Sequence, residues 1–218
     1  MRNFTEHLER YDRVEVSVTT KPPQQRSYEL SWRYEPRVAT QLLGSQKYST
    51  SSRAIGELVA NALDAGAMLI DIELVENALG GTEKLTITDN GRGISPEEIQ
   101  ERFVDVGVAP ASGGEGTRLG RLGVGRLAVH RIGSLSTWTT VAERSSGEAV
   151  RSIFTLRTDG NKRLKVQEEV FAASPTGTTI EIHNILDTGK DRLTATRIAN
   201  DLLSQYCSFL LGQPLART

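Results

Sequence analysis

Two stretches with alternating apolar and polar side chains predict a β-hairpin early in the chain. Residues 68–75 and 84–88 each place an apolar side chain at every second position, which is typical of half-buried strands. The pair Gly80-Gly81 lies between them and supplies a turn. We therefore expect two neighbouring strands that pair in this region.

Helical spacing of apolar positions predicts helices on both sides of this hairpin. Residues 53–65 follow Ser51 and Ser52, which are favourable N-caps. Residues 95–98 (Ser-Pro-Glu-Glu) form a capping box, so a second helix begins there and runs to about Val106. Two further helices are expected at residues 127–132 and 192–211.

The second half of the chain alternates in short stretches separated by turns that contain glycine, serine or asparagine. The strands expected there are residues 135–142, 150–157, 164–170 and 178–183. Helices in the first half and successive antiparallel strands in the second half indicate an α+β fold, built as a two-layer sandwich.

Composition limits the function classes. The 218 residues carry 26 Lys and Arg against 27 Asp and Glu, a net charge of −1, so nucleic acid is not indicated as the main ligand. One cysteine excludes an internal disulfide, and three scattered histidines exclude a Cys/His metal cluster. The charged N-terminus is not a signal peptide, and no apolar run reaches the length of a membrane helix. We expect a cytoplasmic protein that does not associate with membranes.

Two regions differ from the remainder of the chain. Residues 1–27 mix charged and β-branched residues and end near Pro22-Pro23, which predicts an N-terminal strap or extension before one domain over residues 28–218. A mobile terminus without a role explains this pattern equally well. Residues 107–125 contain seven glycines, a density that no helix or strand tolerates, and this predicts a functional loop or lid.

The first candidate for chemistry is a polar stripe on the first predicted helix. Glu57, Asn61 and Asp64 fall at i, i+4 and i+7, within a stripe about 60° wide. A solvated helix face is the ordinary explanation of such a stripe. However, asparagine and aspartate are poor formers of a helix interior. Two acids and an amide without a basic partner also suit a metal ion and a water molecule.

Three other motifs are weak evidence of a functional site when each is taken alone. Residues 89–94 (Asp-Asn-Gly-Arg-Gly-Ile) follow a strand, and are either an ordinary turn or an aspartate that accepts hydrogen bonds from a ligand. Residues 120–125 (GRLGVG) are either a flexible loop or a phosphate cradle before a helix. Their spacing matches neither the dinucleotide fingerprint nor the P-loop. Gly177-Thr178 opens a strand, where threonine is common.

Together, in this order and spacing, the four motifs closely resemble the GHKL superfamily: gyrase B, the large heat-shock chaperone, histidine kinases and MutL. The matching runs are GELVANALDAGA (56–67), DNGRGI (89–94), GRLGVG (120–125) and GTTIEI (177–182). The resemblance extends over most of the chain. It implies a Bergerat-type ATP-binding fold, with helices on one face of a mixed, mainly antiparallel sheet, and a lid over about residues 107–122.

The resemblance also implies roles for individual residues. Asn61 is similar to the ligand of Mg²⁺, and Glu57 to the general base that activates water. Asp89 is similar to the residue that accepts from the adenine amine, with support from Thr178. The other nucleotide-contacting residues that it implies are Asp64, Ala65, Gly91, Gly93, Ile94, Gly120, Gly123, Val124 and Gly125.

The activity expected from this resemblance is Mg²⁺-dependent binding and slow hydrolysis of ATP. Glu57 favours an ATPase over a histidine kinase, which commonly lacks such an acid, although a kinase-type domain and a non-hydrolysing nucleotide sensor stay open. The cation that contacts the γ-phosphate comes from a following domain in hydrolysing relatives, so we expect the N-terminal module of a longer protein. Nucleotide would close the lid and dimerise the module, and nucleic acid would be contacted only through other domains. Residues 120–129 look closest to chaperones and bacterial chaperone-like ATPases.

Overall fold

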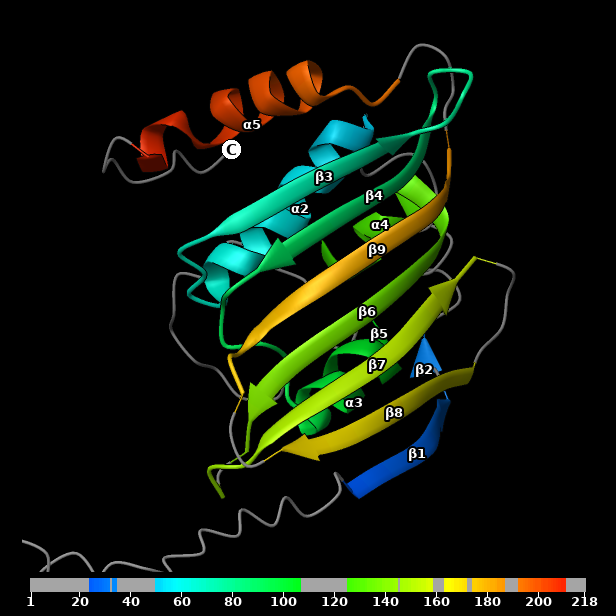
Figure 1. Ribbon diagram of the computed structural model, residues 1–218, viewed down its shortest axis with the longest axis vertical. Coiled ribbons are helices and arrows are strands. Elements are labelled where there is room, and N and C mark those ends of the chain that lie inside the picture. Colours follow the sequence, from blue (N-terminus) through cyan, green and yellow to red (C-terminus); the bar gives the residue numbers. More distant parts are fainter. Residues whose placement is uncertain are drawn as a thin grey trace, which may run out of the picture.

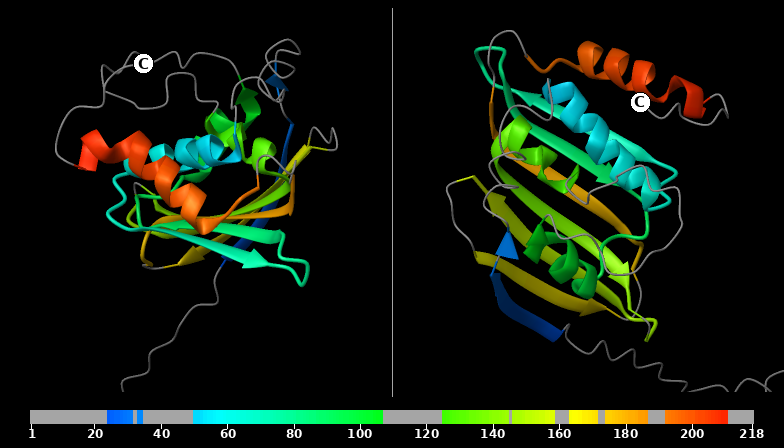
Figure 2. Two further views of the ribbon diagram at one scale, coloured as in Figure 1. Left: turned by 90° about the horizontal axis from the view of Figure 1, so that it is seen from above. Right: turned by 180° about the vertical axis from the view of Figure 1, so that it is seen from behind.

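A seven-stranded sheet forms one layer of the computed structural model, and the helices form the other (Figures 1 and 2). The structure describes residues 24–31, 33–34, 50–106, 125–144, 146–158, 163–171, 174–186 and 192–210.

All neighbouring strands of the large sheet run antiparallel, in the order β1-β8-β7-β6-β9-β4-β3. The strands are β1 (Gln24–Ser31), β3 (Ile70–Glu76), β4 (Thr82–Asp89), β6 (Gly133–Glu143), β7 (Ala149–Arg157), β8 (Arg163–Phe171) and β9 (Gly177–Ile185). A parallel pairing is found in a separate sheet, between β2 (Arg33–Tyr34) and β5 (Asp105–Val106). Within the described residues, the large sheet is therefore purely antiparallel rather than mixed.

The helices cover one face of this sheet, as the turned views of Figure 2 show. They are α2 (Ser51–Asp64), α3 (Pro96–Val104), the 3₁₀ turn η1 (Gly125–Ala128), α4 (Val129–Ile132) and α5 (Ala195–Leu210). The predicted α+β two-layer sandwich with helices on one face is confirmed, as are the hairpin β3–β4 and the four later strands.

The helix ends follow local chemistry. Thr50, rather than Ser51 or Ser52, caps α2 by accepting a hydrogen bond from the Arg53 N–H at 3.2 Å. The predicted capping box of α3 is present, because the Ser95 and Glu98 side chains each accept from the other residue's backbone N–H at 3.2 Å. These caps satisfy N–H groups that lack partners at a helix start.

Strand β1 was not predicted from the sequence. It pairs along its whole length with β8, from Gln24 opposite Val170 to Ser31 opposite Arg163. Its first four residues fall inside the stretch that we expected to be an extension. Only two large apolar side chains, Tyr28 and Leu30, mark its inner face, and both are half-buried. A strand at a sheet edge needs fewer apolar residues, so its sequence signal is weak.

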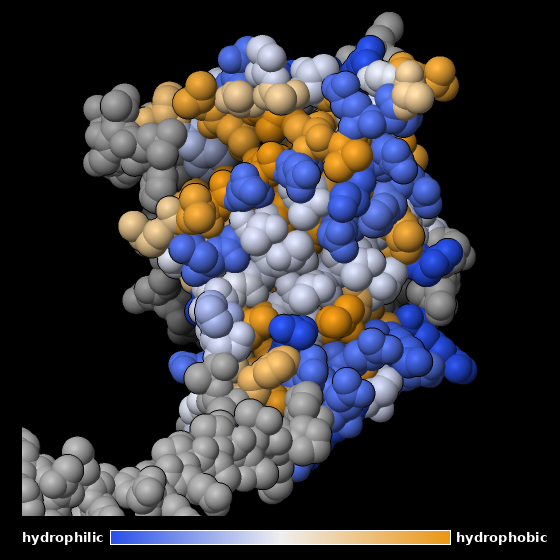
Figure 3. All heavy atoms as spheres, viewed as in Figure 1, coloured by the Kyte–Doolittle hydropathy of each residue, from blue (hydrophilic) through white to orange (hydrophobic). Residues whose placement is uncertain are grey.

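The core lies between the sheet and the helices. Phe103 of α3 packs edge-on against Trp138 of β6 and Phe154 of β7, with ring centroids 5.2 and 4.8 Å apart. The opposite face of the sheet has residues of intermediate hydropathy at its centre (Figure 3). The Thr88 hydroxyl of β4 and the Thr179 hydroxyl of β9 lie 3.3 Å apart. This difference between the two faces explains the alternation seen in the sequence.

None of the described helices combines the length and the apolar character that crossing a membrane requires.

Candidate functional site

Helix α2 presents the predicted polar stripe. Glu57 and Asn61 are half-buried, and Asp64, its last residue, is exposed. Within the described residues, neither the Glu57 carboxylate nor the Asn61 amide takes part in a hydrogen bond or an ion pair. Two oxygen-bearing side chains one helical turn apart are thus free to bind a ligand.

Helix α5 holds α2 in place next to this stripe. The Tyr206 hydroxyl donates to the Gly56 carbonyl oxygen at 2.6 Å, which is a short hydrogen bond between two buried residues. Burial raises the pKa of Tyr206, and the negative charges of Glu57 and Asp64 raise it further. The phenol therefore stays protonated and remains a donor, which fixes the position of Gly56 beside Glu57.

Asp89 ends strand β4 on the helix-facing side of the sheet. Its carboxylate accepts from the Gly91 N–H at 2.8 Å and from the backbone N–H of Thr178, the residue opposite it on β9. Burial raises the pKa of Asp89, and the two backbone hydrogen bonds partly oppose that shift. A carboxylate held by backbone donors keeps lone pairs available for a donor on a ligand.

The turn after Asp89 joins the end of α2. The Arg92 N–H donates to the Ala65 carbonyl at 3.0 Å, and a Cβ at Gly91 would lie 2.9 Å from the Ala65 Cβ. Gly93 adopts a φ of +70°, and a Cβ there would lie only 2.0 Å from the Val141 carbonyl oxygen. Close packing against α2 and β6 therefore requires glycine in this turn, independently of any ligand.

Polar side chains attach the same turn to its other neighbours. The Asn90 side-chain oxygen accepts from the N–H groups of Met68 and Leu69 at 2.9 and 2.8 Å. Arg92 makes a two-bond ion pair with Glu98 of α3, at 3.0 and 2.8 Å. The motif thus connects the end of α2, the two residues before β3, and α3, which brings the first two predicted motifs together.

Thr140 of β6 contacts both the turn after Asp89 and strand β9, and sequence analysis did not identify it. It is fully buried, and its hydroxyl accepts from the Ile94 N–H at 2.8 Å while lying 3.2 Å from the Thr178 hydroxyl. A threonine inside an alternating strand carries no local signal of such a role. Only the strand register, which places Thr140 opposite Thr178, reveals it.

The third motif is described only in part. Gly125 begins η1, which packs against α2. Gly120, Gly123, Val124 and the predicted lid at residues 107–122 lie outside the described residues, so their roles stay predictions.

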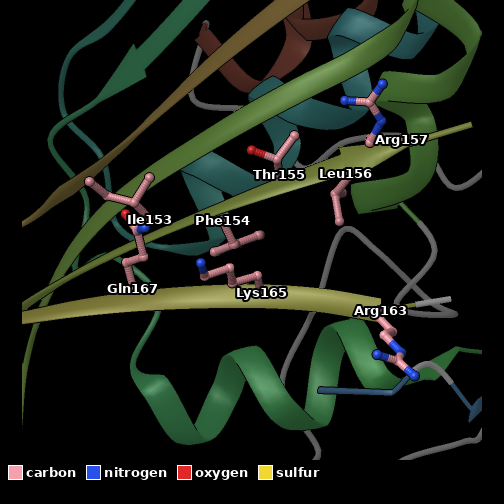
Figure 4. A pocket seen from close by; sticks show the side chains of 8 residues that line it. All are labelled: Ile153, Phe154, Thr155, Leu156, Arg157, Arg163, Lys165 and Gln167. Carbon is pink, nitrogen blue, oxygen red and sulfur yellow. The ribbon is translucent and has the colours of Figure 1, made fainter. Parts of the chain in front are cut away.

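A hollow of about 320 Å³ lies on β7 and β8 (Figure 4). Basic side chains line part of it, including Lys165 and Arg163, and Arg163 pairs with Glu29 of β1 at 3.6 Å. All of the residues around it come from these two strands, and none belongs to the four motifs. The candidate site is therefore a separate region.

Comparison with known proteins identifies the part of the chain that contains the four motifs. A sequence model described as histidine kinase-, DNA gyrase B- and HSP90-like ATPase matches residues 48–188, more than half of the chain. Among curated proteins, the chain is similar to DNA mismatch repair protein MutL from several bacteria. It is 28% identical to that of Paramagnetospirillum magneticum over 169 residues, or 78% of this chain and 26% of the relative.

Two further MutL proteins give similar values. The chain is 31% identical over 180 residues to MutL of Xanthomonas oryzae pv. oryzae, covering 81% of this chain and 27% of the relative. It is 28% identical over 158 residues to MutL of Caulobacter vibrioides, covering 70% and 24%. The chain thus spans about a quarter of the length of these relatives. All three of these relatives are MutL proteins, and the likeness of residues 120–129 to chaperone-like ATPases stays a prediction.

Proposed function

The chain belongs to the histidine kinase-, DNA gyrase B- and HSP90-like ATPase family, and on this premise we propose that it binds ATP with Mg²⁺ and hydrolyses it slowly. The observation that carries the proposal is the Asp89 carboxylate. It is half-buried, held by the Gly91 and Thr178 N–H groups, and attached through its turn to the end of α2. Such an acceptor suits the exocyclic amine of adenine.

The stripe on α2 would serve the triphosphate. The Asn61 amide oxygen would hold Mg²⁺, an ion that takes oxygen ligands and commonly uses only one or two from the protein. Bound Mg²⁺ would neutralise charge on the phosphate oxygens. The half-buried, unpaired Asn61 side chain of the described structure fits this role, and backbone N–H groups of Gly120, Gly123, Val124 and Gly125 would contact the phosphates.

Glu57 would act as the general base. Its carboxylate would accept a proton from a water molecule whose oxygen attacks the γ-phosphorus, while the bond to the β–γ bridging oxygen breaks. ADP and inorganic phosphate are then the products. The absence of a described partner for Glu57 supports this role, since a base committed to an ion pair would be a weaker proton acceptor.

The relatives' name, DNA mismatch repair protein MutL, suggests where such a module would work. We propose that it forms part of a longer, multidomain protein in which ATP closes residues 107–122 over the nucleotide and joins two copies. Hydrolysis would then reopen the lid and separate the copies. Of residues 1–27, those that precede β1 would contribute to that dimer as a strap.

Glu57→Ala tests the proposal. The variant should bind Mg²⁺–ATP within about threefold of the wild type and lose at least about 100-fold in hydrolysis rate, because general-base catalysis contributes on that order. Held in the ATP state, it should also accumulate as a dimer, measured by light scattering.

Glu73→Ala is the matched control, since it removes an exposed carboxylate from β3. Asn61→Ala should instead abolish the dependence of ATP binding on Mg²⁺. Wild-type hydrolysis by Glu57→Ala would contradict the assignment of the base, and an unchanged mass in ATP would contradict the dimer.

A further inference from the structure

One cross-strand row on the helix-facing side of the sheet is polar, although this side otherwise forms the core. The register aligns Asp89, Thr178, Thr140, Ser152 and Glu168 on the successive strands β4, β9, β6, β7 and β8 (Figure 1). The neighbouring row, two residues along each strand, is Ile87, Ile180, Trp138, Phe154 and Val166. Buried polar side chains need hydrogen-bond partners, so the polar row requires an explanation.

Thr140 is the centre of this row and has three polar neighbours. Its hydroxyl oxygen accepts from the Ile94 N–H at 2.8 Å. The same oxygen lies 3.3 Å from the Gly177 carbonyl oxygen and 3.2 Å from the Thr178 hydroxyl. Ile94 ends the turn that follows Asp89, so one buried hydroxyl contacts both the turn and strand β9.

The single proton of this hydroxyl determines the direction of each hydrogen bond. The Gly177 carbonyl only accepts, so that contact is a hydrogen bond only when Thr140 donates to it. Thr140 then has no proton left for Thr178, and the Thr178 hydroxyl must donate to Thr140. This is the one arrangement in which all three contacts of Thr140 are hydrogen bonds.

The consequence concerns the Thr178 hydroxyl. With its proton committed to Thr140, the Thr178 hydroxyl has only lone pairs to offer, beside the Asp89 carboxylate that its backbone N–H contacts. Two neighbouring acceptors suit a group that carries two N–H donors, such as an exocyclic amine. A carbonyl group at the same position would face acceptors only, which is unfavourable.

Building on the proposed function, we propose that Thr140 is a positioning residue for nucleotide selectivity. By committing the Thr178 hydroxyl to act as an acceptor, and by holding the Ile94 N–H, it favours a 6-aminopurine over a 6-oxopurine. Thr140 itself is fully buried and acts through Thr178 and the turn.

The test compares the dissociation constants of ADP and IDP, which carry an amine and a carbonyl at C6, by calorimetry with Mg²⁺. Thr140→Val keeps the shape of the side chain and removes the hydroxyl. It should weaken ADP binding about tenfold, since the Ile94 N–H loses its partner. The selectivity for ADP over IDP, taken as the ratio of their dissociation constants, should fall by a similar factor. Thr140→Ser restores the hydroxyl and should return both values to within about threefold of the wild type.

Ser152→Ala is the matched control. Ser152 is equally buried and is the neighbour of Thr140 in the same row, but within the described residues its hydroxyl has no hydrogen-bond partner. Its removal should leave both dissociation constants unchanged. A general disturbance of the core would instead affect Ser152→Ala as well, and that result would overturn the proposal.

A second variant keeps the test decisive if Thr140→Val does not fold. Thr178→Val removes the acceptor itself and should lower the selectivity for ADP over IDP to the same extent. The double variant should lower this selectivity no further than either single variant does. An unchanged ratio in either single variant overturns the inference about Thr140 alone. A wild-type protein that binds neither nucleotide overturns the proposed function, and this inference with it.

Discussion

Two carboxylates occupy opposite ends of the same polar row, and their surroundings differ. Asp89 is half-buried and accepts from the backbone N–H groups of Gly91 and Thr178, and the described structure pairs no cation with it. Glu168 is buried, and its two oxygens accept from the Tyr28 hydroxyl at 2.7 Å and from Arg144 at 3.2 Å.

This difference separates a candidate ligand site from a structural contact. The partners of Glu168 are side chains from the edge strand β1 and from the residue after β6. Glu168 therefore connects β1 with the end of β6, and both of its oxygens are already occupied by donors from the chain. Burial and the adjacent Glu168 carboxylate raise the pKa of Tyr28, which therefore remains a hydrogen-bond donor. Within the described residues, the Asp89 carboxylate has backbone partners only, which leaves it able to accept from a donor on a ligand, as we propose.

The largest effect on stability is expected from Glu168→Ala. The substitution leaves Arg144 without its partner and the Tyr28 hydroxyl without an acceptor, so the free energy of unfolding should fall by about 3 kcal/mol. Urea unfolding measures this change. Glu169→Ala is the control, because the adjacent pair with Arg151 is more exposed and should contribute less than about 1 kcal/mol. Equal losses in the two variants would remove the contrast with Asp89.

Asp89→Asn should show the opposite pattern, a loss of binding with little loss of stability. A charged acceptor contributes about 1.5–3 kcal/mol to a hydrogen bond, so ADP should bind roughly 10- to 100-fold more weakly. The free energy of unfolding should stay within about 1 kcal/mol of the wild type, since the neutral amide costs less to bury. Calorimetry and urea unfolding of the same preparation provide both values. Normal ADP binding by this variant would show that the pocket has been assigned wrongly.

The smallest effect expected is on the pH dependence of binding. Since burial raises the pKa of Asp89, this carboxyl takes up a proton on acidification before an ordinary aspartate does. ADP affinity should therefore begin to fall at a pH above that at which an ordinary aspartate takes up its proton. The contribution of Asp89 to stability should rise there, because the folded state binds more protons than the unfolded state.

The comparison of wild type with Asp89→Asn isolates this effect from a second titration. Burial lowers the pKa of His130 from 6.5 to about 4, so the folded state loses stability from this side chain as pH falls through that range. Both proteins share His130, and the difference between their pH profiles therefore reports Asp89. Parallel profiles for ADP binding would contradict the role of its charge.

The sequence predicted those parts of the structure whose signal is local. The α2 stripe, the β3–β4 hairpin, the Ser95 capping box and the later strands each follow from spacing within about 15 residues. Strand β1 was missed because an edge strand needs few apolar residues. Thr140 was missed because its partners, Ile94 and Thr178, lie 46 and 38 residues away.

By itself, the sequence determined which side chains are available for chemistry and on which elements they lie, because periodicity, caps and glycine positions act over short distances. The tertiary structure decided which of them meet. The pairing of β4, β9 and β6 places Asp89, Thr178 and Thr140 on adjacent strands, and the Ala65–Arg92 hydrogen bond brings α2 to the same place. A shift of one residue in any strand would turn these side chains to the opposite face, so the sheet register, rather than any single motif, forms the candidate site.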